Sequence, residues 1–229
     1  MEIKTRPKVL FFDVNETLLD LTEMKKHVGK ALNGNEDLLP LWFTTMLQYS
    51  LVVSASGRHE SFGYIGAAAL QMVAKNNNIA ISEIEARKVI LSGLQGLPAH
   101  PDVKEALAHL KQAGYKLVAL TNSSKDSVTK QFKSAGLNDY FEEKLSVDSV
   151  GKFKPFTDVY SWATNKMGVN LEDCMLIAAH GWDVAGALWA GWRAAFVSRP
   201  GQQIFPLAPK TEIEESDLIK IANILVTYK

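Results

Sequence analysis

The sequence predicts an α/β protein built on a parallel, Rossmann-like sheet. Three short apolar runs each end in polar residues, as buried parallel strands do. These runs are residues 9–12, 116–120 and 174–178. Three helical patterns alternate with them and are each closed by a glycine that suits a left-handed helix end. The patterns cover residues 103–113, 125–135 and 157–167. Such an alternation places the polar strand ends along one edge of the sheet, where open parallel sheets bind ligands.

The segment from residue 21 to residue 97 interrupts this alternation. It carries helical patterns with no strand pattern between them, at residues 38–53, 61–75 and 82–94. We therefore predict a helical cap domain, residues 21–97, inserted after the first strand and covering the sheet edge. The α/β core domain is then formed by residues 1–20 and 98–229.

Composition excludes several classes of protein. Of the 229 residues, 47% are hydrophobic and 22% are charged, which is ordinary for a globular chain. Lys plus Arg and Asp plus Glu each number 25, so we expect no nucleic-acid partner. No stretch reaches the ~20 apolar residues of a membrane span, so no membrane partner is expected. One cysteine, and no signal-peptide pattern, predict a cytoplasmic protein.

Asp13 is the first candidate for chemistry. It follows the apolar run 9–12, which places a carboxylate on a loop that leaves a buried strand. Loop amides and a nearby cation could keep it ionised, as a nucleophilic carboxylate requires. The alternative is that Asp13 only caps a helix.

Two further strand and helix ends carry suitable groups. Lys154 precedes a predicted helix and could supply the cation beside Asp13, although a lysine is commonly a solvated surface residue. Thr121 and Asn122 follow the second strand and offer hydroxyl and amide donors for a carboxylate or phosphate. Each of them could equally be a plain helix cap.

Taken in order, four segments resemble the motifs of the haloacid dehalogenase superfamily. They are residues 13–17, 121–122, 154–155 and 180–183. The resemblance covers most of the chain and implies that superfamily's Rossmann-like core, with the helical insertion in the place of its cap.

The phosphatases of that superfamily differ from this chain at two positions. They carry a second Asp two residues after the nucleophile, as general acid, and usually a pair of acids in the fourth motif that help to hold magnesium. Here these positions are Asn15 and Ala179. An asparagine cannot cycle a proton as a carboxylic acid does, and one carboxylate fewer weakens a site for a hard cation. We therefore expect no metal and no organic cofactor.

The details resemble the type II (S)-2-haloacid dehalogenases. By that resemblance, Asp13 displaces halide from the substrate carbon and forms an ester, which water then hydrolyses. Lys154 keeps Asp13 charged, while Thr121 and the amide of Asn122 hold the substrate carboxylate. The implied catalytic residues are Asp13, Thr121, Lys154, His180 and Asp183. The implied substrate-binding residues are Asn15, Phe43, Phe62, Thr121, Asn122, Tyr160 and Trp182.

The chain departs from the dehalogenase pattern in two places. The cap arginine that usually receives the halide is missing, and the nearest cap arginine, Arg58, lies downstream. Asn122 and the positive edges of aromatic rings such as Phe43, Trp42 and Phe62 could replace it. His180 stands where an asparagine is common. It could take a proton from the hydrolytic water, oriented by Asp183, or it could be structural.

Other residues with reactive or charged groups are expected to be structural. Arg193 and Arg199 are predicted to form surface ion pairs, and Cys174 to be a small buried apolar side chain. The side chain of Glu16 could point toward solvent or toward substrate.

The sequence thus predicts a hydrolytic dehalogenase of short (S)-2-haloalkanoic acids or haloacetates. Its expected partners are a small haloacid and, by the family resemblance, a second copy in a homodimer. Two alternatives remain: a phosphatase of the same superfamily acting on a small phosphoester, and a catalytically weak protein that binds a small carboxylate.

Overall fold

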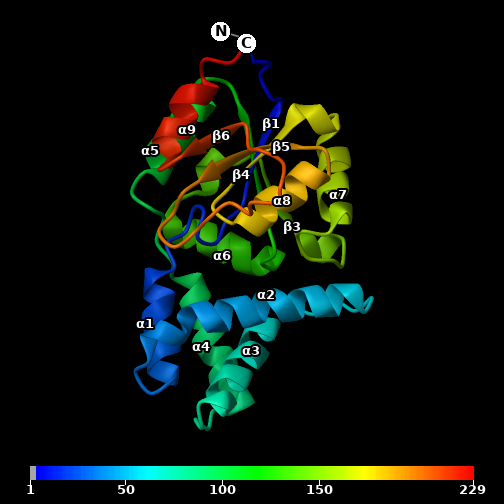
Figure 1. The fold of residues 1–229 in the computed structure, drawn as a ribbon. Helices are drawn as coiled ribbons and strands as arrows, with labels where there is room; N and C mark the ends of the chain where they lie inside the picture. The colour runs from blue at the N-terminus through cyan, green and yellow to red at the C-terminus, as the bar shows by residue number, and fades with distance from the viewer. Residues whose placement is uncertain (1–3) are drawn as a thin grey trace.

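A parallel sheet of six strands forms the centre of the protein (Figure 1). The computed structural model describes residues 4–229. In spatial order the strands are β3 (Glu143–Ser146), β2 (Lys116–Thr121), β1 (Val9–Phe12), β4 (Cys174–Ala178), β5 (Arg193–Val197) and β6 (Ile213–Glu215). Every neighbouring pair is parallel. The predicted fold class, a Rossmann-like α/β sheet, is confirmed.

Strand β1 lies in the middle of this sheet because all four of its residues are apolar. Each is fully buried, as a central strand covered on both faces requires. Phe12, its last residue, pairs with Ala119 of β2 and with Ile177 of β4. The residues that follow these three strands therefore emerge at the same edge of the sheet.

Helices cover both sides of the sheet. They are α5 (Val103–Gln112), α6 (Lys125–Ala135), α7 (Thr157–Met167), α8 (Gly181–Trp189) and α9 (Leu218–Leu225). Helix α5 packs on α9 and α7 packs on α8, and the two pairs lie on opposite sides in Figure 1. Gly136 and Gly168 end α6 and α7 with φ angles of 68° and 65°, the left-handed conformation predicted for them.

Four helices form a separate layer at the carboxyl edge of the sheet (Figure 1). They are α1 (Thr22–Ala31), α2 (Leu39–Ala55), α3 (Phe62–Asn76) and α4 (Glu83–Gln95). The two connections to the core run side by side, because Leu19 bridges to Ala99 and the His100 amide donates to the Leu18 carbonyl. The sequence pattern predicted the last three of these helices. It missed α1 because most residues of this helix lie on its polar face.

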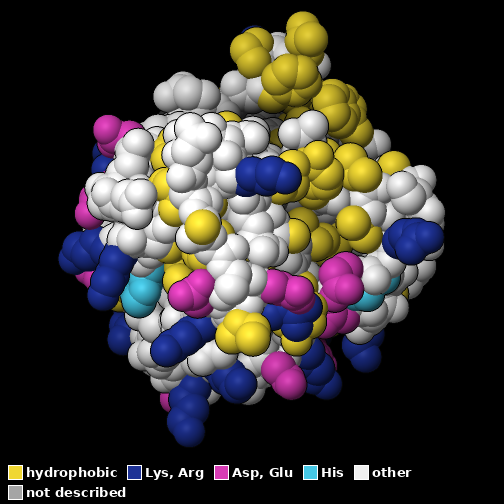
Figure 2. All heavy atoms as spheres, turned by 90° about the horizontal axis from the view of Figure 1, so that it is seen from below, with side chains coloured by type: hydrophobic (Ala, Val, Ile, Leu, Met, Phe, Trp, Pro, Cys, Tyr) yellow, Lys and Arg dark blue, Asp and Glu magenta, His cyan; other side chains and the backbone are white. Residues whose placement is uncertain are grey.

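The expectation that no segment is long and apolar enough to span a membrane is wrong for one helix. By length and composition alone, the helix Glu36–Ala55 could span a membrane. Its most apolar window has a mean hydropathy of 1.3, and 22% of that window is buried in the protein. Its buried residues include Trp42, Met46, Ser50 and Ser54. Several of its other apolar side chains are exposed, and Figure 2, seen from the side of these four helices, shows hydrophobic side chains gathered in one region of this face.

Gly186, in α8, allows the core helices to approach the loop that carries Lys154. A Cβ atom added there would lie 2.3 Å from the Cβ of Pro155 and 2.7 Å from the hydroxyl of Tyr160. We expect Gly186→Ala to lower the free energy of unfolding by about 1–3 kcal/mol, because Pro155 must move. Gly96→Ala, with nothing within 4 Å, is the control. Equal denaturation midpoints for the two variants would contradict this packing argument.

Candidate active site

The candidate site lies where β1, β2 and β4 end. Asp13 follows β1 and its backbone N–H donates to the Ile177 carbonyl of β4, so the sheet fixes its position. Thr121 ends β2, and His180 follows β4 as the residue before α8. Asp13 is only 5% exposed. The parallel sheet thus brings together side chains that are more than 160 residues apart in the sequence.

Three groups donate hydrogen bonds to the Asp13 carboxylate. The Lys154 ammonium lies 2.9 Å from Oδ1, while the Thr17 hydroxyl and His180 Nδ1 lie 2.7 and 3.0 Å from Oδ2. Burial by itself would raise the pKa of Asp13, but the charge of Lys154 and the bonds from His180 and Thr17 hold it far below its ordinary range. Asp13 is therefore an ionised carboxylate in a place that excludes water.

Lys154 is the cation of the site. Its ammonium is fully buried and donates to Asp13, to Asp183 and to the Leu120 carbonyl, which uses all three of its N–H groups. Burial would lower the pKa of Lys154, but the two carboxylates raise it above its ordinary value, so the ammonium stays charged.

These contacts also decide how well the site suits magnesium, which the phosphatases of the predicted superfamily use. The Lys154 ammonium already bridges the carboxylates of Asp13 and Asp183, the two acids that a metal would need. Within residues 4–229, no group of three or more His, Cys, Asp or Glu side chains is arranged to hold a metal ion. The donor set therefore fits an ammonium ion better than a hard divalent cation.

Asp183 completes the ionic cluster. It is fully buried, and the Tyr160 hydroxyl donates to its Oδ1 at 2.6 Å. Burial raises the pKa of Asp183, and the nearby charge of Asp13 adds to the effect against the opposing influence of Lys154. Burial, and then the charge of Asp183, raise the pKa of Tyr160 well above its ordinary value, so its hydroxyl remains a donor. Asp183 therefore acts on Lys154, and the expectation that it orients His180 is wrong, because the partner of His180 is Asp13. Tyr160, expected to bind substrate, holds Asp183 and lines neither of the cavities described below.

His180 contacts Asp13 on one side of its ring. Because a carboxylate only accepts hydrogen bonds, Nδ1 carries a proton in this contact. Nε2 is buried and has no partner among residues 4–229. The ring stacks on Phe43 and on Trp182, with centroid distances of 5.5 and 5.3 Å. These contacts fix the imidazole plane and leave Nε2 available for a proton.

Asn122 and Thr121 lie beside this cluster. The Asn122 side chain accepts a hydrogen bond from the Lys154 backbone at 2.9 Å, and its Nδ2 donor is buried without a partner in the described part of the chain. The Thr121 hydroxyl is buried and accepts from the Ser123 backbone at 3.1 Å. Asn122 Nδ2 is therefore a free donor for an anionic ligand.

Two predicted binding residues take other positions. Asn15 donates to the Ser123 hydroxyl and accepts from Gln131, so both ends of its amide are engaged within the protein. Phe62, at the start of α3, packs on Phe153 with a centroid distance of 5.6 Å. Neither residue lines the cavities described next.

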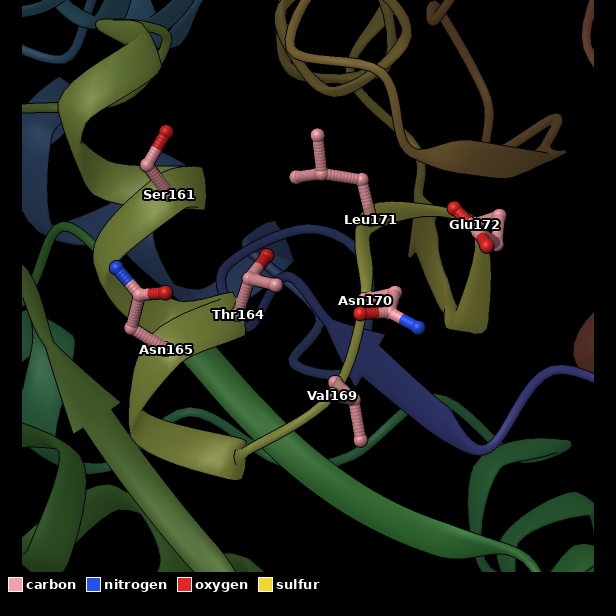
Figure 3. A pocket seen from close by; sticks show the side chains of 7 residues that line it. All are labelled: Ser161, Thr164, Asn165, Val169, Asn170, Leu171 and Glu172. Carbon is pink, nitrogen blue, oxygen red and sulfur yellow. The ribbon is translucent and has the colours of Figure 1, made fainter.

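Two cavities reach the site between the helical layer and the core. The larger, of about 480 Å³, contains Phe43, His180 and Trp182 together with Glu16 and Lys25. The smaller, of about 310 Å³, runs along α2 to Lys154, Pro155 and Trp182. A third hollow, between α7 and residues 169–172 (Figure 3), contains none of the predicted site residues.

Sequence reasoning missed or left open three residues near Asp13. Thr17 was quoted only as part of the first motif, yet its hydroxyl donates to Asp13 and accepts from the Ala179 backbone. Glu16 lines the larger cavity with a left-handed backbone, φ 65°, and burial raises its pKa. Lys25 is a cation in the wall of that cavity, whereas Arg58 is exposed and lines neither cavity. Because the sequence pattern did not predict α1, it gave no signal that Lys25 lies at this cavity.

A buried arginine supports the loop that follows Asp13. Arg199 is only 7% exposed, so the expectation of a surface ion pair is wrong. Its guanidinium donates to the Thr17 carbonyl at 3.0 and 3.3 Å and to Asp102 at 2.9 Å. His100 Nε2 lies 2.9 Å from the neighbouring carbonyl of Glu16. These contacts hold the backbone from which the Thr17 hydroxyl reaches Asp13.

Comparison with known proteins identifies the family of this chain. Residues 7–191 match the haloacid dehalogenase-like hydrolase family. The chain therefore belongs to the haloacid dehalogenase-like hydrolases, and the predicted resemblance is confirmed.

Individual relatives cover nearly the whole chain. An (S)-2-haloacid dehalogenase of Pseudomonas sp. (strain YL) is 25% identical over 96% of this chain and 95% of its own. The (S)-2-haloacid dehalogenase H-109 of Pseudomonas putida is 28% identical over 95% and 97%. Among solved structures, the L-2-haloacid dehalogenase of Xanthobacter autotrophicus with chloropropionic acid covalently bound has a TM-score of 0.89 at 23% identity, covering 96% of this chain and 98% of its own.

The contacts of Arg199 predict a change in local opening of the nucleophile loop. Arg199→Lys keeps a charge beside Asp102 but loses the planar fork that holds the Thr17 carbonyl. We expect amide hydrogen exchange at residues 16–19 to accelerate about tenfold, the effect of losing a charged hydrogen bond of ~1.5 kcal/mol. Arg193→Lys, whose fork binds Glu212 instead, is the control. Unchanged exchange in Arg199→Lys would rule out this supporting role.

Proposed function

We propose that this protein is a hydrolytic dehalogenase that converts (S)-2-haloalkanoic acids or haloacetates to 2-hydroxy acids. The observation that carries the proposal is the environment of Asp13. A buried carboxylate is held ionised by a lysine in the position where a metal would otherwise bridge two acids. The names of its relatives, (S)-2-haloacid dehalogenases, support the same substrate class.

In the first step, a carboxylate oxygen of Asp13 attacks the carbon that bears the halogen. The new C–O bond forms as the carbon–halogen bond breaks, and the halide leaves with the bonding electrons. A carboxylate is a poor nucleophile in water but a better one when it is desolvated beside an oriented carbon. The burial of Asp13 and its three fixed donors provide that state.

In the second step, water attacks the carbonyl carbon of the Asp13 ester. The ring nitrogen of His180 that faces Asp13 is Nδ1, at 3.0 Å, so His180 takes a proton from this water on Nδ1, in the tautomer whose ring proton lies on Nε2. The ester C–O bond on the Asp13 side breaks as His180 gives its proton to the leaving oxygen, so that the 2-hydroxy acid leaves. The water oxygen stays in the Asp13 carboxyl group, which releases its remaining proton to solvent. Lys154 compensates the negative charge that develops on the ester oxygen.

Substrate and halide need donors other than a cap arginine. The free Nδ2 of Asn122 and the hydroxyl of Thr121 suit the substrate carboxylate. For the halide, the ring edges of Phe43 and Trp182 lie in the larger cavity, and Lys25 adds a positive charge to its wall. Phe62 is less suitable for this role because it packs on Phe153.

We further propose that the protein is cytoplasmic, acts on a small molecule and binds neither nucleic acid nor membrane. The equal numbers of acidic and basic residues support the absence of a nucleic-acid partner. Assembly as a homodimer is supported by the exposed hydrophobic side chains on the face seen in Figure 2.

The aspartyl ester predicts where isotope from water is found. During turnover of (S)-2-bromopropionate in heavy-oxygen water, the Asp13 peptide should gain heavy oxygen, which mass spectrometry detects. Asp13→Asn should lose at least ~10⁴-fold in kcat while keeping its fold, since the amide is nearly isosteric but a far weaker nucleophile.

Each of the following outcomes would contradict this assignment. Heavy oxygen that appears in the product but never in the Asp13 peptide would mean that water attacks the substrate directly. Loss of halide release on adding a chelator, or phosphate release that depends on magnesium, would favour the phosphatase. Ligand-induced stabilisation with no turnover would favour a binding protein.

The role of His180 predicts a defect in the second step. His180→Asn should slow ester hydrolysis by ~10²–10⁴-fold, the usual contribution of a general base, so that alkylated Asp13 accumulates after a burst of halide.

His27→Asn, on the exposed face of α1, is the matched control and should keep the native rate without accumulating alkylated Asp13. A His180→Asn variant with the native steady-state rate and no burst would show that the histidine is structural.

A further inference from the structure

Phe153, the residue before Lys154, is held by side chains of the helical layer. Its backbone N–H donates to the Ser54 hydroxyl at 3.0 Å, and both residues are buried. Its ring packs on Phe62 and on His59, with centroid distances of 5.6 and 5.8 Å. Phe153 therefore contacts the segment that runs from the end of α2 to the start of α3.

Ser54 supplies the polar part of this contact. It is a buried residue in the last turn of α2. A serine in a helix can bond to a carbonyl one turn earlier, as the Ser50 hydroxyl does with Leu47 at 2.7 Å. The Ser54 hydroxyl accepts from the core instead, and among residues 4–229 the Phe153 N–H has no other partner. Without Ser54 this N–H would be a buried, unpaired donor, which is costly.

The next residue along the loop is Lys154, whose contacts lie on the core side. Its backbone N–H donates to Asn122 Oδ1 at 2.9 Å, and its ammonium donates to Asp13. The N–H groups of two adjacent residues thus hold the loop from opposite sides, with Ser54 on the helical layer and Asn122 on the core. Because one planar peptide unit joins Phe153 to Lys154, a displacement of the first moves the second. A misplacement of about 1 Å can cost a catalytic site ~10²-fold in rate.

We propose that Ser54 is a positioning residue for Lys154: by accepting the Phe153 N–H, it makes the packing of the helical layer on the core set the cation in place beside the nucleophile. For its effect on turnover, the proposal rests on the dehalogenase function proposed above. Helix α2 then contacts the site at two points, covering His180 through Phe43 and holding the lysine loop through Ser54.

The first test is chemical labelling of Lys154, which needs no turnover. The whole protein is treated with acetic anhydride under native conditions, and mass spectrometry follows the Lys154 peptide. Ser54→Ala should be labelled ~10-fold faster than the native protein, because the unpaired Phe153 N–H favours local opening of the loop. Ser50→Ala is the matched control, since its hydroxyl is also buried in α2 but bonds to Leu47 within the helix. Equal labelling rates in the two variants would overturn the proposal.

The second test is the pH dependence of bromide release from (S)-2-bromopropionate in a single turnover, which reports attack by ionised Asp13. Burial raises the pKa of Asp13, and the charge of Lys154 and the contact with His180 lower it. Asp183 and Glu16 are the other titratable groups whose charges interact with Asp13. All of these groups are retained when Ser54 is replaced. If the loop moves Lys154 away, the effect of burial prevails and the pKa of Asp13 rises.

Ser54→Ala should therefore lose single-turnover bromide release at a higher pH than the native enzyme as the pH falls. At a pH where the native enzyme is fully active, its rate should be at least ~10-fold lower. Ser50→Ala should lose bromide release at the native pH. A native rate and pH profile in Ser54→Ala would show that Ser54 serves the fold alone and would overturn its role in the reaction. If the native enzyme releases no bromide while Ser54→Ala is still labelled faster at Lys154, the dehalogenase function fails and the positioning of Lys154 stands.

Discussion

The ammonium of Lys154 is the interaction on which the rest of the site depends. It sits between two buried carboxylates, Asp13 and Asp183, each of which would cost several kcal/mol to bury alone as an ion. One positive charge cannot neutralise two acids, so further donors are required. Tyr160 supplies one to Asp183, while Thr17 and His180 supply two to Asp13. The cluster keeps Asp13 ionised and free of water, which is the state that attack on carbon requires.

The ionic cluster keeps Asp13 desolvated only because another layer of the protein covers it. The sheet brings Asp13 and Asp183 to one edge, and the four-helix layer closes that edge with α2, whose Phe43 stacks on His180. The seam between layer and core remains open at two cavities of different polarity. Desolvation of the nucleophile and access for substrate are therefore provided by the same boundary, and residues on α2 control both.

The site also balances charge without an arginine among the residues that line its two cavities. An anionic substrate must enter a site that already holds two carboxylates, and the donors that meet it are neutral: Asn122 Nδ2, Thr121 and aromatic ring edges. A positive charge, Lys25, stands farther out in the wall of the larger cavity. Among the described residues, His180 Nδ1 contacts the Asp13 carboxylate and Nε2 has no hydrogen-bond partner, so the imidazole is positioned to exchange a proton beside Asp13.

The sequence by itself determined the α/β class, the predicted helical insertion and the four segments that carry Asp13, Thr121, Lys154 and His180. Strand periodicity and glycine helix ends are local signals, and parallel strands present their carboxyl ends at one edge whatever else the chain does. The tertiary structure alone decided that Arg199 is buried against the Thr17 carbonyl, that Asn15 is engaged by Gln131, and that α2 and the core leave an apolar groove. These features depend on contacts between residues far apart in the chain, and a single sequence contains no local signal of which distant groups will meet.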